Sequence, residues 1–130
     1  MASQVLKRMA AALRPGQAGE DAACAYLRGC GFAILHRNFR CRSGEVDVVA
    51  KDGDTVVFVE VKERHGASHG EGHEAVTFGK RRRLVRAATI YAAARGLSES
   101  PVRFDVVSID HDGGTRRIRH DRGAFDADGR

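Results

Sequence analysis

Acidic and basic side chains alternate with apolar ones along two neighbouring segments, residues 45–50 and 56–62. The side chains that could do chemistry there are Glu45, Asp47, Glu60 and Lys62. Successive side chains of a β-strand point to opposite faces, so in two paired strands these four share one face. Close carboxylates repel one another, and a divalent cation relieves that repulsion. Because the ligands are carboxylate oxygens, with no Cys or paired His in the strands, they favour Mg²⁺ or Mn²⁺ over zinc.

A metal ion between Asp47 and Glu60 would lower the pKa of a bound water and neutralise charge on a phosphodiester. Lys62 would orient that water or stabilise the charge that develops. The alternative is an exposed ladder of ion pairs among Glu45, Glu60 and Lys62, worth about 0–1 kcal/mol. Apolar side chains on the same face favour the metal site, because they predict a covering helix: Val49, Val56 and Phe58.

The two segments are joined by residues 51–54 (KDGD), and Asp-Gly between β-branched runs is a strong hairpin signal. A loop at residues 52–53, or at 51–54, predicts that Asp47 lies opposite Phe58. Asp47 is then diagonal to Glu60, about 7–8 Å away or less between side-chain roots. The other face holds only apolar side chains: Val46, Val48, Val57, Val59 and Val61. The hairpin therefore predicts one acidic face and one apolar face.

Periodicity elsewhere predicts the elements that position this hairpin. We expect helices at 16–31 and 80–96, further strands at 32–35 and 102–109, and loops at 36–42 and 63–79. The order helix, strand, hairpin, helix, strand predicts an α/β fold, with a small mixed central β-sheet flanked by helices.

At 130 residues the chain has room for one domain, which excludes a multidomain enzyme. We expect a flexible leader at 1–15, the domain at 16–110 and a polar tail at 111–130. The longest apolar run is far shorter than the roughly 20 residues of a membrane span, so no membrane partner is expected. Three cysteines without a CxxC motif are typical of reduced thiols in a cytoplasmic protein.

The charge balance favours a polyanionic partner. Lys and Arg number 22 against 17 Asp and Glu, a net charge of +5, and the planar fork of arginine matches phosphate oxygens. The residues expected to contact nucleic acid form the densest run: Lys80, Arg81, Arg82, Arg83 and Arg86. A second, weaker group is Arg116, Arg117, Arg119 and Arg122. A solvated helix face is the alternative for the first run.

The stretches GEVDVV at 44–49 and VVFVEVKER at 56–64 resemble the Asp and Glu-x-Lys signature of the PD-(D/E)xK nuclease superfamily. Together with GQAGEDAACAYLRGCGF, AVTFGKRRRL and RFDVVSI they resemble the bacterial YraN-like family over residues 16–109. This resemblance implies a restriction-endonuclease-like core and a metal-dependent endonuclease acting on DNA, including structured or junction DNA.

Residue by residue, the resemblance implies that Asp47 and Glu60 bind Mg²⁺ or Mn²⁺ together with the carbonyl of Val61. It implies that Lys62 is the catalytic lysine and that Glu20 on the first helix joins the site. The proline that leads the superfamily motif is absent, since valine precedes Asp47. A proposed fold does not by itself establish turnover.

Other functions stay open. In a non-catalytic nucleic-acid-binding module, the arginines would hold the backbone and the carboxylates would be structural. A homodimer would suit an enzyme that cuts two strands, and the sequence leaves the oligomeric state undecided. His65, His69 and His73, spaced by four, would form a transition-metal site on a helix, although the glycines between them favour a loop.

Overall fold

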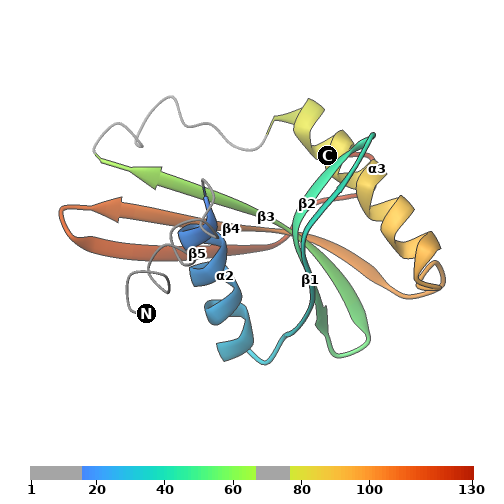
Figure 1. Cartoon of the computed structure of the whole chain (residues 1–130), viewed down its shortest axis with the longest axis horizontal. Coiled ribbons are helices and arrows are strands. Elements are labelled where there is room, and N and C mark those ends of the chain that lie inside the picture. Colours follow the sequence, from blue (N-terminus) through green and yellow to red (C-terminus); the bar gives the residue numbers. More distant parts are fainter. Residues whose placement is uncertain (1–15, 67–76) are drawn as a thin grey trace, which may run out of the picture.

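The computed structural model describes residues 16–66 and 77–130, so the expected leader at 1–15 lies outside the described residues. The elements are α2 (Gln17–Gly29), β1 (Ala33–Cys41), β2 (Gly44–Asp52), β3 (Thr55–His65), α3 (Phe78–Ala94), β4 (Val102–Asp112) and β5 (Thr115–Phe125). The strands form one sheet in the order β1-β2-β3-β4-β5 (Figure 1). β3 and β4 are parallel and the other pairs are antiparallel. The predicted α/β fold with a small mixed sheet flanked by helices is confirmed.

The two helices bury opposite faces of the central strands, because side chains alternate along β3. Val56 and Phe58 pack with Leu84 and Tyr91 of α3. Val57 and its alternate neighbours pack with α2 instead. The chain crosses from β3 to the parallel β4 through α3, since parallel strands need a long connection. The helix expected to cover the acidic face is therefore α3.

The β2–β3 hairpin is present, but its predicted register is wrong by two residues. Asp52 pairs with Thr55 around a two-residue loop, and Phe58 lies opposite Val49 and not Asp47. Gly53 takes a φ of +62° at the first loop position, which glycine adopts without strain. In this register the Arg103 guanidinium of β4 donates to the Asp52 carboxylate at 2.9 Å. A shift of two preserves the alternation along β3.

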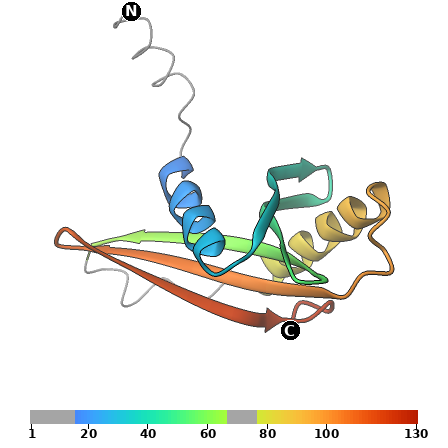
Figure 2. The same ribbon diagram turned by 90° about the horizontal axis from the view of Figure 1, so that it is seen from below.

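β2 separates from β3 just where the acidic residues begin. The last pair of the β2–β3 ladder is Val48 with Val59. Beyond it Val46 packs with Val49 on the α3 face and not with Val48 on the α2 face, which corrects its predicted face. Figure 2 shows β3, β4 and β5 running side by side while the β1–β2 hairpin turns away from them. The two strands thus form a fork at Asp47.

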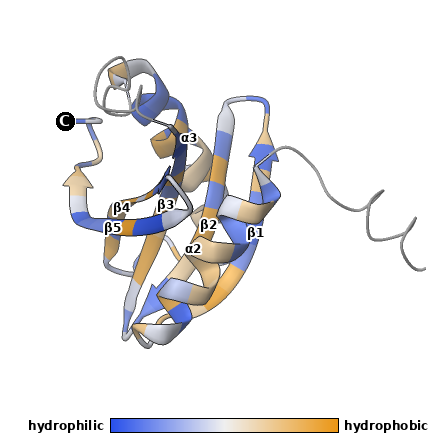
Figure 3. Cartoon of the chain, turned by 90° about the vertical axis from the view of Figure 1, so that its left-hand side faces the viewer, coloured by the Kyte–Doolittle hydropathy of each residue, from blue (hydrophilic) through white to orange (hydrophobic). Residues whose placement is uncertain are grey.

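Two expected irregular segments are strands. Residues 36–42, expected as an open loop, lie largely within β1, which pairs with β2 and accommodates its polar side chains through a bulge between Ile34 and His36. The expected polar tail at 111–130 contains β5, which follows a turn at Gly113 and Gly114, both with positive φ. β5 pairs with β4 along most of its length. Figure 3 shows hydrophobic colour along β2 and hydrophilic patches on α3 and β5.

The expected loop at 63–79 is only partly described. β3 continues to His65, and residues 67–76 lie outside the described residues. Among the described segments, no helix has the length and hydropathy to cross a membrane. The three cysteines are free thiols, as expected.

Candidate metal centre

Asp47 lies at the fork and replaces a backbone partner of β3. The backbone N–H of Val61 donates to its Oδ2 atom at 2.8 Å. In a strand, the N–H and C=O of one residue point to the same neighbouring strand. The carbonyl of Val61 therefore faces the opening in which the Asp47 carboxylate lies. The fork brings together two of the oxygen groups that the resemblance assigned to the metal.

Glu60 adds the second carboxylate. Its side chain is half-buried like that of Asp47, and the two lie close enough that each affects the pKa of the other. Burial, and next the negative charge of Asp47, raise the pKa of Glu60 from 4.5 to about 8. Burial also raises the pKa of Asp47, while the Val61 N–H opposes that rise. Two adjacent half-buried carboxyl groups, one of them with a pKa raised to about 8, form a site that a divalent cation would satisfy.

Glu20 approaches the pair from the α2 side. It is 4% exposed, and its negative charge contributes to the raised pKa of Asp47. The Nε of Arg37 donates to the Glu20 carboxylate at 3.1 Å, and Arg37 also binds Asp21. The structure thus places Glu20 near Asp47 with its charge balanced by an arginine of β1.

On the opposite side, Glu60 meets the first turn of α3. Glu45, Glu60, Lys80 and Arg83 line a cavity of about 80 Å³ together with a buried leucine. The positive charge of Lys80 lowers the pKa of Glu60, against the stronger effect of burial. Glu45 forms an ion pair with Arg40 of β1, and not the ion pair with Lys62 that the alternative predicted.

The second turn of α3 lies close against the start of β2. A Cβ on Gly44 would lie 2.3 Å from the carbonyl oxygen of Arg83, which is backbone and cannot yield easily. The helix begins at an N-cap in which the Thr77 hydroxyl accepts from the N–H of Lys80 at 3.2 Å. This close approach holds the basic turn of α3 beside the carboxylates.

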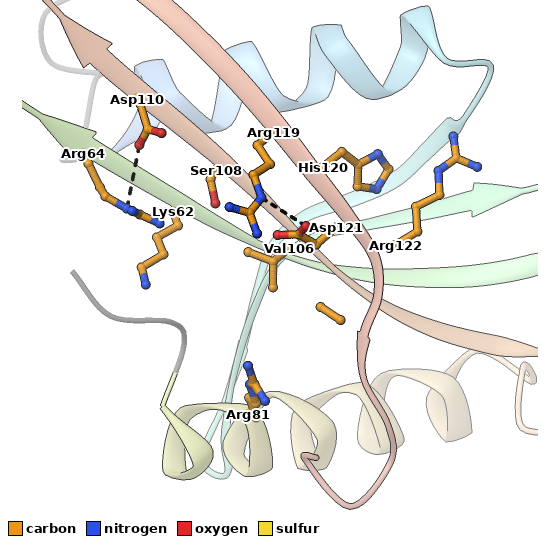
Figure 4. Close-up of a pocket in the computed structure, with 11 residues that line it drawn as sticks. Lys62, Arg64, Arg81, Val106, Ser108, Asp110, Arg119, His120, Asp121 and Arg122 are labelled. Atoms are coloured by element: carbon orange, nitrogen blue, oxygen red, sulfur yellow. Dashed lines mark hydrogen bonds and ion pairs between the residues drawn. The ribbon is translucent and has the colours of Figure 1, made fainter. Parts of the chain in front are cut away.

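Lys62 faces a basic groove between α3 and the β4–β5 hairpin (Figure 4). It lies two residues beyond Glu60, so the pleat turns both toward the α3 side of the sheet. The groove has a volume of about 690 Å³. Its charged residues are Lys62, Arg64, Arg81, Arg119, Arg122, Asp110 and Asp121. The Arg122 guanidinium lies over the Phe32 ring on the α2 side, so four cations and two carboxylates face the groove. This excess of positive charge suits a phosphate backbone.

The basic run of α3 spreads around the helix. Arg81 points into the groove and lies over the Phe125 ring at 5.2 Å. Arg82 lies over Phe78 at 5.6 Å on another side. Arg83 lines the small cavity by Glu60, and Arg86 is exposed. The run therefore contributes one side chain to the groove, not a continuous strip.

Several groove residues carry no sequence signal for a role in the site. Arg119 of β5 belongs to a segment that reads as a polar tail, and Arg64 with its partner Asp110, 3.8 Å away, matches no motif. The Gly113-Gly114 pair between two alternating segments was the available signal for a second hairpin.

The donor set of the fork fits a hard cation. Two carboxylates and one carbonyl are oxygen ligands, and Mg²⁺ commonly binds through one or two carboxylates while it keeps several waters. Glu20, Asp47 and Glu60 do not have ligand atoms all within 4.8 Å of one another. Across residues 16–66 and 77–130, the one group of three that meets this distance lies elsewhere, at Glu63, His65 and His111.

Comparison with known proteins shows the family of this chain. The model of "Uncharacterised protein family UPF0102" matches residues 19–109, more than half of the chain. The chain belongs to the UPF0102 family. The UPF0102 match confirms the resemblance to YraN-like proteins and includes Glu20, Asp47, Glu60 and Lys62.

Curated UPF0102 relatives align with most of the chain. A UPF0102 protein of Symbiobacterium thermophilum is 50% identical over 97 residues, which are 75% of this chain and 82% of the relative. One from Syntrophotalea carbinolica is 46% identical over 114 residues, 88% of this chain and 93% of the relative. One from Anaeromyxobacter dehalogenans is 47% identical over 115 residues, 88% and 86% respectively. The names of these relatives state the family and no activity.

Proposed function

We propose that this chain is a metal-dependent endonuclease that hydrolyses phosphodiester bonds in DNA, with Mg²⁺ or Mn²⁺ as its metal. The observation that carries the proposal is the fork of β2 and β3, where the Val61 N–H holds the Asp47 carboxylate at 2.8 Å beside the half-buried carboxyl of Glu60. Beside it lie the carbonyl of Val61 and, one pleat further on, Lys62 at the edge of a basic groove. As its substrate we propose structured or junction DNA.

In the proposed mechanism, Asp47, Glu60 and the Val61 carbonyl would hold the metal, and the Val61 N–H fixes the orientation of the Asp47 carboxylate. The bound metal supplies charge neutralisation at the scissile phosphate and lowers the pKa of a nucleophilic water. Glu60 would bind the metal in its deprotonated form, since a nearby cation favours the charged carboxylate and so lowers its pKa. Lys62 donates to the water or to a phosphate oxygen.

The groove holds the DNA backbone beside this centre. Arg81 of α3 and Arg119 of β5 line opposite walls, and phosphate contacts of this kind position a strand without reading its bases. Glu20 acts through Asp47. Because Arg37 balances the charge of Glu20, Glu20 positions the Asp47 carboxylate from the α2 side of the fork.

Cleavage assays on the full chain test the proposal. Plasmid, single-stranded, flap and Holliday-junction DNA are incubated with Mg²⁺ or Mn²⁺ and wild type, Asp47→Asn or Lys62→Met. We expect cleavage by wild type and a loss of about 100-fold or more in each variant. Asp54→Asn, in the exposed hairpin loop, and Lys51→Met on β2 are matched charge controls that keep activity.

The outcomes separate the two function classes. Cleavage that persists in Asp47→Asn contradicts the metal centre. Binding without cleavage in every protein leaves the nucleic-acid-binding module, which the groove also supports. Groove binding is tested by Arg81→Ala, which should weaken DNA affinity and reduce the slope of log affinity against log salt by about 1. Arg28→Ala, exposed on α2, is its control.

A further inference from the structure

A second cluster of ligand side chains lies at the far ends of β3 and β4. His65 and His111 are directly opposite one another in the parallel ladder, and Glu63 lies two residues before His65 on the same face. That face is the α2 side, because the Glu63 carboxylate lies against Gly19 of α2. Lys62 and Arg64 point to the other side, into the basic groove. The cluster is therefore separate from the Asp47 centre and from the groove.

The three side chains converge on one oxygen atom. The Nε2 of His111 is 2.7 Å from Oε2 of Glu63, and the Nε2 of His65 is 3.8 Å from the same oxygen. The two imidazole rings stack with centroids 4.4 Å apart and planes 8° apart. All three ligand atoms lie within 4.8 Å of one another. Ligand atoms of a tetrahedral zinc ion, with bonds of about 2.0–2.1 Å, are themselves about 3.3 Å apart.

We propose that Glu63, His65 and His111 form a binding site for a divalent transition metal of the zinc class. Two imidazoles and one carboxylate are a donor set typical of Zn²⁺ sites that keep a position open for water. Nitrogen ligands favour such a metal over Mg²⁺, which takes oxygen ligands. The inference stands on these three residues and does not depend on the proposed nuclease activity.

Small movements would complete the site. A metal lies in the plane of each imidazole, so the stacked rings must tilt apart, and the His65 side chain is 70% exposed and has room to turn. Glu63 has less freedom. A Cβ on Gly19 would lie only 2.6 Å from its Oε1 atom, so the helix holds the carboxylate in place. The backbone N–H of Gly66 donates to the carbonyl of His111 at 3.0 Å, which keeps the two strand ends together.

A bound ion would tie the ends of β3 and β4 together and, through Glu63, to the start of α2. In the structure, Glu63 forms a hydrogen bond with His111, and the His65 ring stacks on the His111 ring. This hydrogen-bonded arrangement is the alternative that the experiment must exclude.

The sequence interpretation of His65, His69 and His73 as ligands on one helix is wrong for His65, which ends β3. His69 and His73 lie outside the described residues. The double variant His69→Ala with His73→Ala is therefore a matched control. It removes two histidines that follow closely in the sequence and leaves the proposed ligands in place.

Titration of the full chain with Zn²⁺ after removal of metal by EDTA tests the site, by calorimetry and by melting temperature. Co²⁺ serves as a second probe, since its visible absorption reports a tetrahedral site. We expect about one Zn²⁺ bound per chain in wild type, a rise in melting temperature on binding, and a loss of affinity of at least about 100-fold in His65→Ala and His111→Ala. The exposed His65 side chain makes the first variant the decisive one, because its metal-free melting temperature should match that of wild type.

Two further variants make the result specific. Asp47→Asn and the His69→Ala, His73→Ala double variant should both bind Zn²⁺ as wild type does. No Zn²⁺ binding by wild type, or binding that survives in His65→Ala with the wild-type Co²⁺ spectrum, overturns the proposal. Binding lost in Asp47→Asn assigns the zinc to the fork and overturns it as well.

Discussion

Replacing Glu60 by Gln should abolish most of the pH dependence of stability near neutral pH. In the metal-free chain the pKa of Glu60 is about 8, against an ordinary 4.5. Between these values the folded chain holds a proton that the unfolded chain has released, so the free energy of unfolding falls as pH rises. The slope approaches about 1.4 kcal/mol per pH unit, and the total is on the order of 5 kcal/mol. This loss is a large part of the 5–15 kcal/mol typical of a domain.

Urea unfolding of the metal-free protein, followed by circular dichroism from about pH 5 to about pH 9, measures this slope. Wild type should lose stability across the range, and Glu60→Gln should remain nearly level and be the more stable protein at the alkaline end. Glu99→Gln, at an exposed position outside the helices and strands, should follow wild type. Mg²⁺ should restore wild type at high pH and leave Glu60→Gln unchanged. A wild-type curve that is flat or rises with pH refutes the reasoning.

Three other substitutions test the surroundings of the site. Gly44→Ala should cost about 1–3 kcal/mol in urea unfolding, because its Cβ would meet the backbone of Arg83, and an unchanged midpoint contradicts the contact. Asp105→Asn should lower the free energy of unfolding by about 3–5 kcal/mol, since it breaks the ion pair between the buried Asp105 carboxylate and the Arg103 guanidinium. Burial alone would raise the pKa of Asp105, but hydrogen bonds to its carboxylate lower it, so its contribution should disappear only as pH falls below about 4. Lys80→Met should move the pH dependence due to Glu60 to higher pH in the same urea series.

The faces of β3, and of β2 from Val48 onward, could be predicted from sequence because alternation has a period of two, whereas Val46 lies beyond the fork on the other face. The register error of two residues left Glu60 and Lys62 on the α3 side with Phe58, so the acidic face was covered by a helix as expected. The register itself could not be predicted from the turn. The observed register includes an ion pair between Asp52 and Arg103, which lie far apart in the chain and which no local pattern connects.

Other parts of the site depend on features that local patterns do not record. The fork between β2 and β3 has no sequence motif, and it is what allows the Asp47 carboxylate to reach the N–H of Val61. β5 was missed because an arginine-rich edge strand buries little apolar surface and resembles a polar tail. The basic wall of the groove forms only because β5 pairs with β4.

The most direct measurement of the central claim is the anomalous scattering of Mn²⁺ in crystals of the full chain. The account predicts one peak between the carboxylates of Asp47 and Glu60, within bonding distance of the Val61 carbonyl and with the Lys62 ammonium beside it. Density for the Lys62 ammonium between the two carboxylates, with no manganese peak there at saturating Mn²⁺, would contradict it.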